Sequence, residues 1–395
     1  MSEGARSWVI IGGGVHGVHL ALMLREHHGL EPEQVCILDP HDAPLARWSM
    51  CAQSTGMRYL RSPAVHHLAP DPWSLRDFAK RRDTWDFRAP YDRPSTALFR
   101  AHTEWLCEEA AIERSWCQGR ALAVLPNADR VRVLTHGGEL VASRVALALG
   151  SGDAVCWPAW AAPWRRRPER ARHIFEPGCV LALDDLRPNE PVAVIGGGIS
   201  AAQLAARIAD TGAHVTLITR HPLRIHQFDS ASGWLGPKLM SGFSRQRSME
   251  TRRELIQMAR YRGSMPRDVL NDLRRAQRRG RVRVIEAYVR AALERAGDAT
   301  IMLDLDRAPH TCQVTRVFLA TGFAPGRPGG ALVGGLASVL PTAPCGFPIV
   351  DEALRWHPRV HVLGPLAELE LGPTSRNISG ARRAAERIVR SSGTA

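Results

Sequence analysis

Two glycine-rich turns carry residues whose types and spacing suit the binding of a nucleotide pyrophosphate. The first has the sequence GGGVHG at residues 12–17, between an apolar run at 8–11 and a segment with helical apolar spacing. In such a turn Gly12 allows a tight change of direction, Gly14 lets the backbone approach the phosphates, and Gly17 lets the helix pack closely on the strand. The start of the helix then faces the phosphates with its unpaired backbone N–H groups.

An acidic residue stands where a site of this kind needs one. The next apolar run, at 35–38, ends in Asp39, which lies 22 positions after Gly17. A carboxylate about 20 residues beyond the turn accepts hydrogen bonds from a ribose of the dinucleotide. The alternative is a glycine turn that serves packing alone. Because strand, turn, helix, second strand and acid occur together in order, the dinucleotide site is favoured.

The second turn repeats this arrangement later in the chain. It has the sequence GGGISA at residues 196–201, follows a further apolar run and precedes a helical segment. We predict that Gly196, Gly198, Ser200 and Ala201 contact a second dinucleotide there.

The strand after the second turn ends in a basic residue instead of an acid. Arg220 follows the apolar run at 214–218 and lies 19 positions after Ala201. An acid here would repel a ribose 2′-phosphate, whereas a guanidinium pairs with it, so NADPH is favoured over NADH. The alternative is that Arg220 is a solvated arginine at a strand end in an arginine-rich chain.

Two nucleotide-binding folds are needed to position these turns, and a chain of 395 residues suits two domains. A closing strand at 360–363 and a helix at 377–390 would complete the first fold after the second. We therefore predict an α/β protein with two Rossmann-like, three-layer nucleotide-binding domains, the second inserted in the first. The predicted boundaries are 1–155 for the first part of the first domain, 156–188 for a connecting segment, 189–315 for the second domain, and 316–395 for the completion of the first.

The overall composition is that of a globular protein, with 45% hydrophobic and 23% charged residues. No window approaches the roughly 18 uncharged apolar residues of a membrane helix, so we expect no membrane partner. The residues before the first apolar run are too few for a secretory signal, which predicts a cytoplasmic location. The eight cysteines include no C-x-x-C pair, so we expect reduced thiols and neither a disulfide scaffold nor a zinc site.

The net charge of +13 raises the question of nucleic-acid binding. Lysine occurs only at Lys80 and Lys238, so the positive charge is almost all arginine, and it is spread along the chain without an interleaved aromatic motif for stacking bases. We predict no nucleic-acid partner. A positive field would instead favour the association of two anionic dinucleotides.

The arrangement resembles flavoproteins with two dinucleotide-binding domains, and among them the class B flavin monooxygenases, especially the ornithine and lysine N-hydroxylases. The resemblance covers nearly the whole chain. It is carried by the turn at 12–17, by GGGISAA at 196–202, by ATGF at 320–323 and by the segment 48–78. It implies FAD in the first fold, NADPH in the second, and oxygen transfer from a hydroperoxyflavin to a small amine, with that substrate and O2 as partners. Dimers and tetramers are frequent in this group, which implies a homo-oligomer.

The resemblance also implies where FAD contacts the chain, because the last helix of these proteins is directed at the isoalloxazine ring. A capping role would explain Thr374 and Ser375 equally well. The implied FAD residues are Gly12, Gly14, Gly17, Asp39, Gly150, Gly364 and Asn377.

In these relatives, the stretch that matches segment 48–78 leads from a tryptophan through a flavin-facing glutamine to a basic residue on the substrate side. Gln53, Arg58 and Arg61 are the nearest matches. The two arginines have three open roles: binding a substrate carboxylate or phosphate, binding the FAD pyrophosphate, or binding structural carbonyls. His66 and His67 lack a carboxylate or cysteine at metal-ligand spacing, so we predict no metal.

The chain departs from two related signatures. Disulfide reductases need a paired thiol beside the flavin, and no C-x-x-C exists here. The F-x-G-x-x-x-H signature of amine and sulfide monooxygenases is replaced by HIFEP at 173–177. The alternative function is an FAD-dependent reductase or dehydrogenase that passes electrons to another acceptor. Residues 227–290 form either solvated helix faces or a lid over the substrate.

Overall fold

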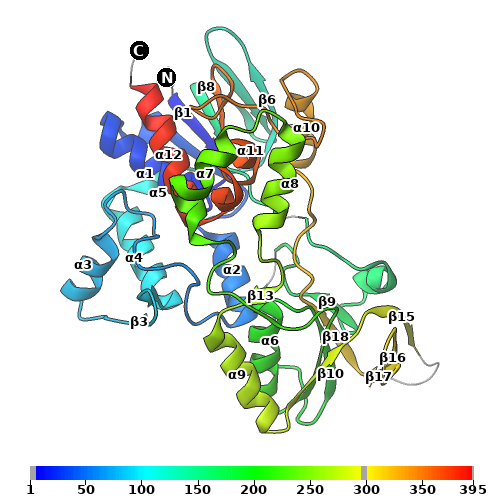
Figure 1. Ribbon diagram of the computed structural model, residues 1–395. Coiled ribbons are helices and arrows are strands. Elements are labelled where there is room, and N and C mark those ends of the chain that lie inside the picture. Colours follow the sequence, from blue (N-terminus) through cyan, green and yellow to red (C-terminus); the bar gives the residue numbers. More distant parts are fainter. Residues whose placement is uncertain (1–5, 153, 179, 295–299, 394–395) are drawn as a thin grey trace.

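The computed structural model describes residues 6–152, 154–178, 180–294 and 300–393. Two sheets lie at opposite ends of the molecule (Figure 1). In the first, β1 pairs in parallel with β2 on one side and β8 on the other. Its strands, in spatial order, are β19 (Arg355–His357), β20 (Val360–Val362), β8 (Gly138–Leu147), β1 (Arg6–Ile11), β2 (Val35–Asp39) and β5 (Trp116–Gln118), with β6 (Ala121–Pro126) and β7 (Val131–Thr135) attached through β8.

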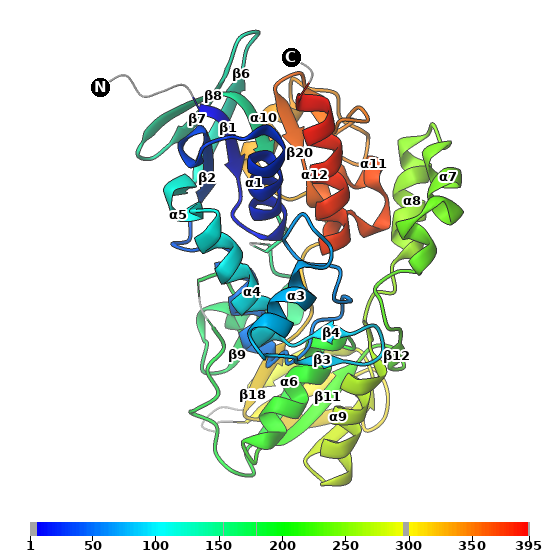
Figure 2. The ribbon, with the colours of Figure 1, turned by 90° about the vertical axis from the view of Figure 1, so that its left-hand side faces the viewer.

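Both faces of this sheet are covered, which is why its central strands read as continuous apolar runs. Helices α1 and α12 lie side by side on one face (Figure 2). The β6–β7 hairpin and α10 cover the other face. The elements that flank the sheet are α1 (Val15–His28), η1 (Pro32–Gln34), α5 (Ile112–Ser115), α10 (Gly330–Ala337), η4 (Gly364–Ala367), α11 (Glu368–Leu371), η5 (Pro373–Arg376) and α12 (Ile378–Ser392).

The second sheet is fully parallel and has the same three-layer plan. Helices α6 and α9 pack on one face, while a three-stranded antiparallel sheet and η2 pack on the other. Its strands, in spatial order, are β14 (Val282–Glu286), β11 (His214–Thr219), β10 (Pro191–Ile195), β18 (Arg316–Leu319) and β9 (Ala171–His173). The covering elements are η2 (Ala159–Arg166), α6 (Ile199–Asp210), α9 (Arg267–Arg278), β15 (Val289–Glu294), β16 (Ile301–Leu305) and β17 (Thr311–Val314).

The second sheet is nested in the first, as predicted, because β20 pairs with β8 in the first sheet after the second is complete. Two predicted boundaries are wrong. We expected the first domain to resume at residue 316, but β18 pairs with β10 and belongs to the second sheet. The run at 316–319 is buried and apolar, and such a pattern does not tell which of two parallel sheets a strand joins. The predicted start of the second domain at residue 189 is also wrong, because β9 lies in the predicted connecting segment 156–188 and pairs with β18 of the second sheet. The boundary at residue 155 remains a prediction.

Two excursions connect the sheets. The first leaves the first sheet after β2 and contains α2 (Ala46–Thr55), α3 (Ser74–Arg81), β3 (Phe87–Arg88), β4 (Arg93–Pro94) and α4 (Thr96–Glu109). The second leaves the second sheet after β11 and contains β12 (Arg224–Ile225), η3 (Ser232–Leu235), α7 (Pro237–Ser244), α8 (Met249–Ala259) and β13 (Ser264–Met265).

Helices α7 and α8 cross back to the first domain, beside α11 (Figures 1 and 2). Their residues Met240, Phe243 and Ile256 form a buried cluster with Phe347 and Leu369. The region predicted as solvated helix faces or a lid therefore packs in part against the first domain. None of the helices in the described ranges combines the length and apolar character that a membrane crossing requires.

Candidate dinucleotide sites

The first glycine turn has the geometry that its sequence predicts. Gly12 has φ +113°, and a Cβ there would lie 2.6 Å from the carbonyl oxygen of Ala148. A Cβ on Gly17 would lie 1.8 Å from the carbonyl oxygen of Gly12, so helix α1 approaches the turn as closely as only glycine permits. At Gly14, in contrast, no atom lies within 4 Å of an added Cβ. The turn is thus tight where the fold needs it and open where a pyrophosphate would approach.

Asp39 ends β2 beside this turn. Its carboxylate accepts hydrogen bonds from the backbone N–H of Gly13 at 2.6 Å and from the backbone N–H of His41 at 2.9 Å. Trp116 on β5 lies against the same turn, because a Cβ on Gly13 would be 2.1 Å from its indole ring. No sequence motif marks Trp116, which the pairing of β2 with β5 brings to the turn.

The end of the chain closes over the start of α1. Gly364 has φ +60°, and a Cβ there would lie 3.5 Å from the ring of His16. The His16 Nε2 atom lies 2.9 Å from the carbonyl oxygen of Ser375. Burial lowers the pKa of His16, so its ring is neutral at pH 7. The Ser375 hydroxyl is buried and has no hydrogen-bond partner among the described residues, which fits a bound group at this position.

Two further predicted FAD residues, Asn377 and Gly150, lie at the start of a helix and after the end of a strand, respectively. Asn377 precedes α12 but does not cap it with its side chain; the amide donates instead to Asp229, at 3.0 Å. Gly150 follows the carboxyl end of β8, the edge of the sheet at which α/β proteins bind their ligands. Contact of either residue with FAD remains a prediction.

The second turn is built in the same way. Gly196 has φ +148°, and a Cβ there would lie 2.5 Å from the carbonyl oxygen of Ala320. Ala201 is fully buried against Gly196, as the packing position of such a turn requires. Gly198 precedes α6 and Ser200 lies in its first turn. A Cβ on Gly198 would lie 3.4 Å from the Cα atom of Gly263, so the β13 segment runs across this turn.

Arg220 lies directly after β11 with an exposed side chain. Within the described ranges it makes no hydrogen bond or ion pair, so its guanidinium is free to meet an anion.

We expect Arg220→Ala to weaken NADPH binding about 10- to 100-fold, because a charge-assisted hydrogen bond contributes about 1.5–3 kcal/mol. NADH binding should stay unchanged. Titration of each nucleotide into the protein measures both, with Arg187→Ala, at the opposite end of the sheet, as the control; an equal loss for both nucleotides would contradict a 2′-phosphate contact.

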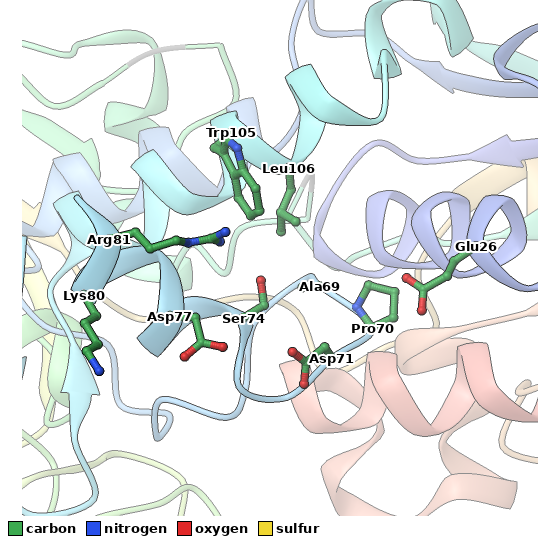
Figure 3. A pocket seen from close by; sticks show the side chains of 10 residues that line it. All are labelled: Glu26, Ala69, Pro70, Asp71, Ser74, Asp77, Lys80, Arg81, Trp105 and Leu106. Atoms are coloured by element: carbon green, nitrogen blue, oxygen red, sulfur yellow. The ribbon is translucent and has the colours of Figure 1, made fainter.

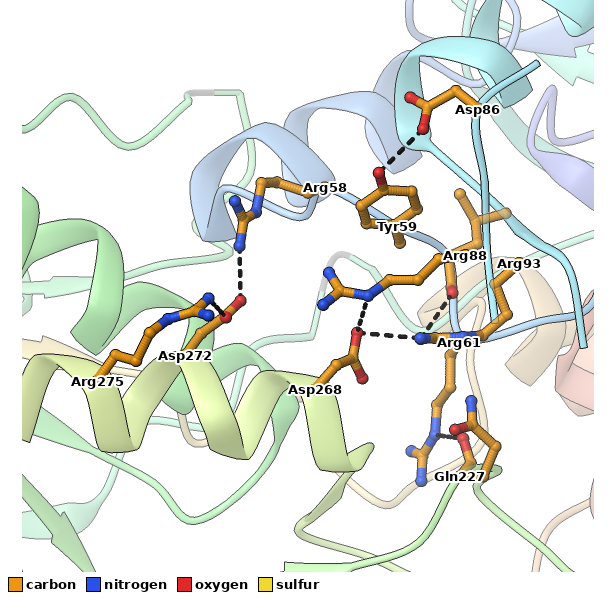
Figure 4. Close-up of polar contacts among 11 residues, drawn as sticks. Arg58, Tyr59, Arg61, Asp86, Arg88, Arg93, Gln227, Asp268, Asp272 and Arg275 are labelled. Atoms are coloured by element: carbon orange, nitrogen blue, oxygen red, sulfur yellow. Dashed lines mark hydrogen bonds and ion pairs between the residues drawn. The ribbon is translucent and has the colours of Figure 1, made fainter. Parts of the chain in front are cut away.

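The three residues predicted from segment 48–78 do not meet at one point. The Gln53 side chain is exposed at the end of α2, and its backbone carbonyl accepts a hydrogen bond from Arg207 of the second domain at 3.2 Å. Arg58 forms an exposed ion pair with Asp272 on α9, at 2.6 Å (Figure 4). Arg61 binds backbone carbonyls, which was one of its three open roles.

A buried glutamate surrounded by arginines was not predicted from the sequence. Glu368 is fully buried and forms ion pairs with Arg253, and with Arg376 at 2.9 Å, while Arg260 lies 4.0 Å away. Burial lowers the pKa of Arg260 to about 9 and that of Arg376 to about 10. This cluster joins the first domain to α8 and its end. No motif marks Glu368, whose partners come from distant parts of the chain.

His66 and His67 lie in a buried loop, where burial lowers the pKa of each to about 4. The His67 Nε2 atom lies 3.1 Å from the carbonyl oxygen of Pro72, a structural contact. Among the described residues no group of three or more histidine, cysteine or acidic side chains is arranged to hold a metal ion.

A pocket of about 810 Å³ lies away from both glycine turns (Figure 3). It is a groove on the outer face of the first domain, between α1, α3 and α4, lined among others by Glu26, Asp77 and Trp105. Neither turn contributes to its lining, so the dinucleotide sites are identified by the turns and not by pocket size.

Comparison with protein families supports this assignment of the turns. Residues 9–152 match the family described as FAD-NAD(P)-binding, and residues 191–235 match the family described as pyridine nucleotide-disulphide oxidoreductase. Each match contains one glycine turn. The first fold is thus an FAD- or NAD(P)-binding domain, and the second is a pyridine-nucleotide type of fold. No curated protein matches the sequence closely enough to count as a relative.

Solved structures resemble the whole chain. The ornithine N-hydroxylase of Kutzneria sp. 744 superimposes with a TM-score of 0.75 at 19% identity, over 98% of this chain and 99% of that one. The L-lysine 6-monooxygenase of Pseudomonas syringae gives a TM-score of 0.74 at 17% identity, over 98% of each chain. The chain has the ornithine and lysine N-hydroxylase fold. A bacillithiol disulfide reductase from Bacillus cereus matches with a TM-score of 0.62 at 16% identity, over 98% of each chain.

The N-hydroxylase fold confirms the predicted fold class and, at the level of fold, the resemblance read from the sequence. It also accounts for the nested order of the sheets, since the match extends through both sheets. At identities of 19% and 17%, this likeness shows the fold, and the function of a fold is set by the residues of its sites.

Proposed function

We propose that this chain is an FAD- and NADPH-dependent monooxygenase that N-hydroxylates a small amine or amino-acid-derived substrate. One observation carries the proposal: an N-hydroxylase fold spans the chain, and both of its glycine turns keep the geometry that a dinucleotide needs. The Kutzneria structure was solved with reduced FAD, NADP⁺ and L-ornithine. A bound flavin would supply hydride acceptance and oxygen activation, and the protein would bind, orient and shield it.

The residues of the chain have definite tasks in this proposal. Gly14 and the N-terminus of α1 would bind the FAD pyrophosphate, and Asp39 would accept hydrogen bonds from its ribose. Gly198 and Arg220 would hold the phosphates of NADPH. The buried Ser375 hydroxyl, which lacks a partner among the described residues, would donate to the flavin. The neutral His16 keeps positive charge away from the same point while it fixes the Ser375 carbonyl.

The alternative function is that of a reductase or dehydrogenase, and two findings support it. The second fold matches the disulphide oxidoreductase family, and a disulfide reductase shares the overall fold. The absence of a C-x-x-C pair argues against disulfide reduction, but not against transfer of electrons to another acceptor.

Stopped-flow absorbance distinguishes the two functions. The flavin of the purified protein is reduced with NADPH under anaerobic conditions and then mixed with oxygenated buffer. We expect a species absorbing in the near ultraviolet to precede the return of oxidised flavin, and its decay to quicken with the true amine substrate. Direct reoxidation without such a species would reject the monooxygenase and favour another electron acceptor.

A further inference from the structure

Two segments of the second domain form a ribbon that lies against the second glycine turn. It comprises residues 224–230 and 260–265, in which β12 and β13 pair in parallel, and we call it the bridging ribbon. The Tyr261 N–H donates to the carbonyl oxygen of Asp229 at 2.8 Å, which ties the two segments together.

The bridging ribbon contacts the second turn and also Asn377, a predicted FAD residue of the first domain. On one side Gly263 runs across the second turn, 3.4 Å from the position of a Cβ on Gly198. On the other side the Asp229 carboxylate accepts a hydrogen bond from Asn377, directly before α12. Displacement of the ribbon would therefore move the second turn relative to the end of the first site.

Arg61 holds this ribbon on the first domain (Figure 4). Its Nε donates to the carbonyl oxygen of Gln227 at 2.8 Å, and its Nη2 contacts the carbonyl oxygens of His226 at 2.8 Å and Phe228 at 2.6 Å. The same Nη2 lies 2.9 Å from the hydroxyl of Ser264, on the second segment. A planar guanidinium suits such a set of acceptors, because its donors are fixed in one fork.

A second contact beside it holds α9. Arg93 is 2% exposed, and its Nη2 donates to Asp268, in the first turn of α9, at 3.0 Å (Figure 4). Arg88 approaches the same carboxylate at 3.5 Å. Since α9 and the bridging ribbon belong to the same domain, that domain is held at two separate points.

We propose that Arg61 is a positioning residue, which sets the distance between the nicotinamide and the flavin by anchoring the bridging ribbon to the first domain. This inference rests on the proposed function in so far as NADPH reduces the flavin. Arg61 need not touch either nucleotide, because its four contacts are all to protein atoms of the ribbon.

The test compares wild type with Arg61→Met and Arg61→Lys, each loaded with FAD. With Arg61→Met we expect the limiting rate constant for flavin reduction by NADPH to fall about 100-fold, since a misplacement of about 1 Å can cost that much. FAD content and reduction by dithionite should not change. Arg61→Lys keeps the charge and three donors, so it should recover part of the rate. Arg279→Met removes an exposed ion pair on the same domain and should react like wild type.

Hydrogen exchange supplies a measurement that does not depend on NADPH chemistry. The amides of His226 and Tyr261 donate within the ribbon, and we expect both to exchange faster in Arg61→Met. Wild-type reduction rates in that variant, or slower reduction with unchanged exchange, would overturn the proposal. If NADPH fails to reduce the flavin of the wild-type protein, the proposed function is rejected, and so is the role of Arg61 in setting the distance between nicotinamide and flavin. The exchange data would still decide whether Arg61 anchors the ribbon.

Discussion

Gly14→Ala should yield a folded protein that has lost its FAD. Gly14 has φ −79° and ψ −170°, a conformation open to alanine, and no atom lies within 4 Å of the added Cβ. The methyl group would, however, occupy the space through which a pyrophosphate approaches the backbone. Losing charge-assisted hydrogen bonds worth about 3 kcal/mol weakens FAD binding about 100-fold.

The measurement is the ratio of flavin to protein absorbance after purification, together with the melting temperature of the flavin-free protein. Gly242→Ala, in α7 and also with no atom within 4 Å of its Cβ, is the matched control and should keep its flavin. Full flavin content in Gly14→Ala would show that the first turn does not bind the pyrophosphate. Substitution of Gly14 separates a role in binding from a role in packing. Substitution of Gly12 or Gly17 would not, because a side chain at either position would disturb the fold itself.

Acid should destabilise this protein well above the pH at which its carboxylates titrate. Burial lowers the pKa values of His19, His102 and His361 to about 3 each. The folded state therefore keeps these rings neutral, whereas the unfolded chain binds a proton on each below pH 6.5. Stability is fully present above pH 6.5 and falls as the pH decreases towards 3. Each histidine costs about 1.4 kcal/mol per pH unit, so the three together cost about 6 kcal/mol at pH 5.

Urea unfolding at pH 8, 6.5 and 5 measures this loss, which is comparable to the whole stability of many domains. His361→Phe keeps an aromatic ring against Trp8 but removes the titrating group. The free energy of unfolding should therefore decrease by about 2 kcal/mol less between pH 6.5 and 5 than in the wild type. Replacement of the exposed His136 by glutamine should leave the decrease unchanged. A stability that does not vary between pH 6.5 and 5 would show that these rings are not buried in neutral form.

Several arginines have a structural role that the composition does not predict. From the sequence, the only expected effect of their positive charge is a field that favours the association of dinucleotides. In the structure, several arginines bind backbone carbonyls of distant segments: Arg47 contacts residues 152, 175 and 176, and Arg382 contacts residues 67, 69 and 70. A forked donor meets several carbonyls at once, which a lysine does less well.

The sequence by itself determined the local geometry of the two candidate dinucleotide sites. The glycine turns at 12–17 and 196–201, Asp39 and Arg220 each belong to one strand–turn–helix unit, in which residue type and spacing fix the backbone path. The nested order of the two folds also followed from the order of strands along the chain.

The tertiary structure alone decided which sheet takes the strand at 316–319, and which partners Arg61, Glu368 and Trp116 meet. Strand pairing between parallel sheets depends on packing across long stretches of chain, and a buried apolar strand suits either sheet. Contacts of arginines with backbone carbonyls leave no pattern in the sequence, because every residue offers a carbonyl. The local geometry of the turns could therefore be predicted from the sequence, whereas the contacts between the two domains depend on the tertiary structure.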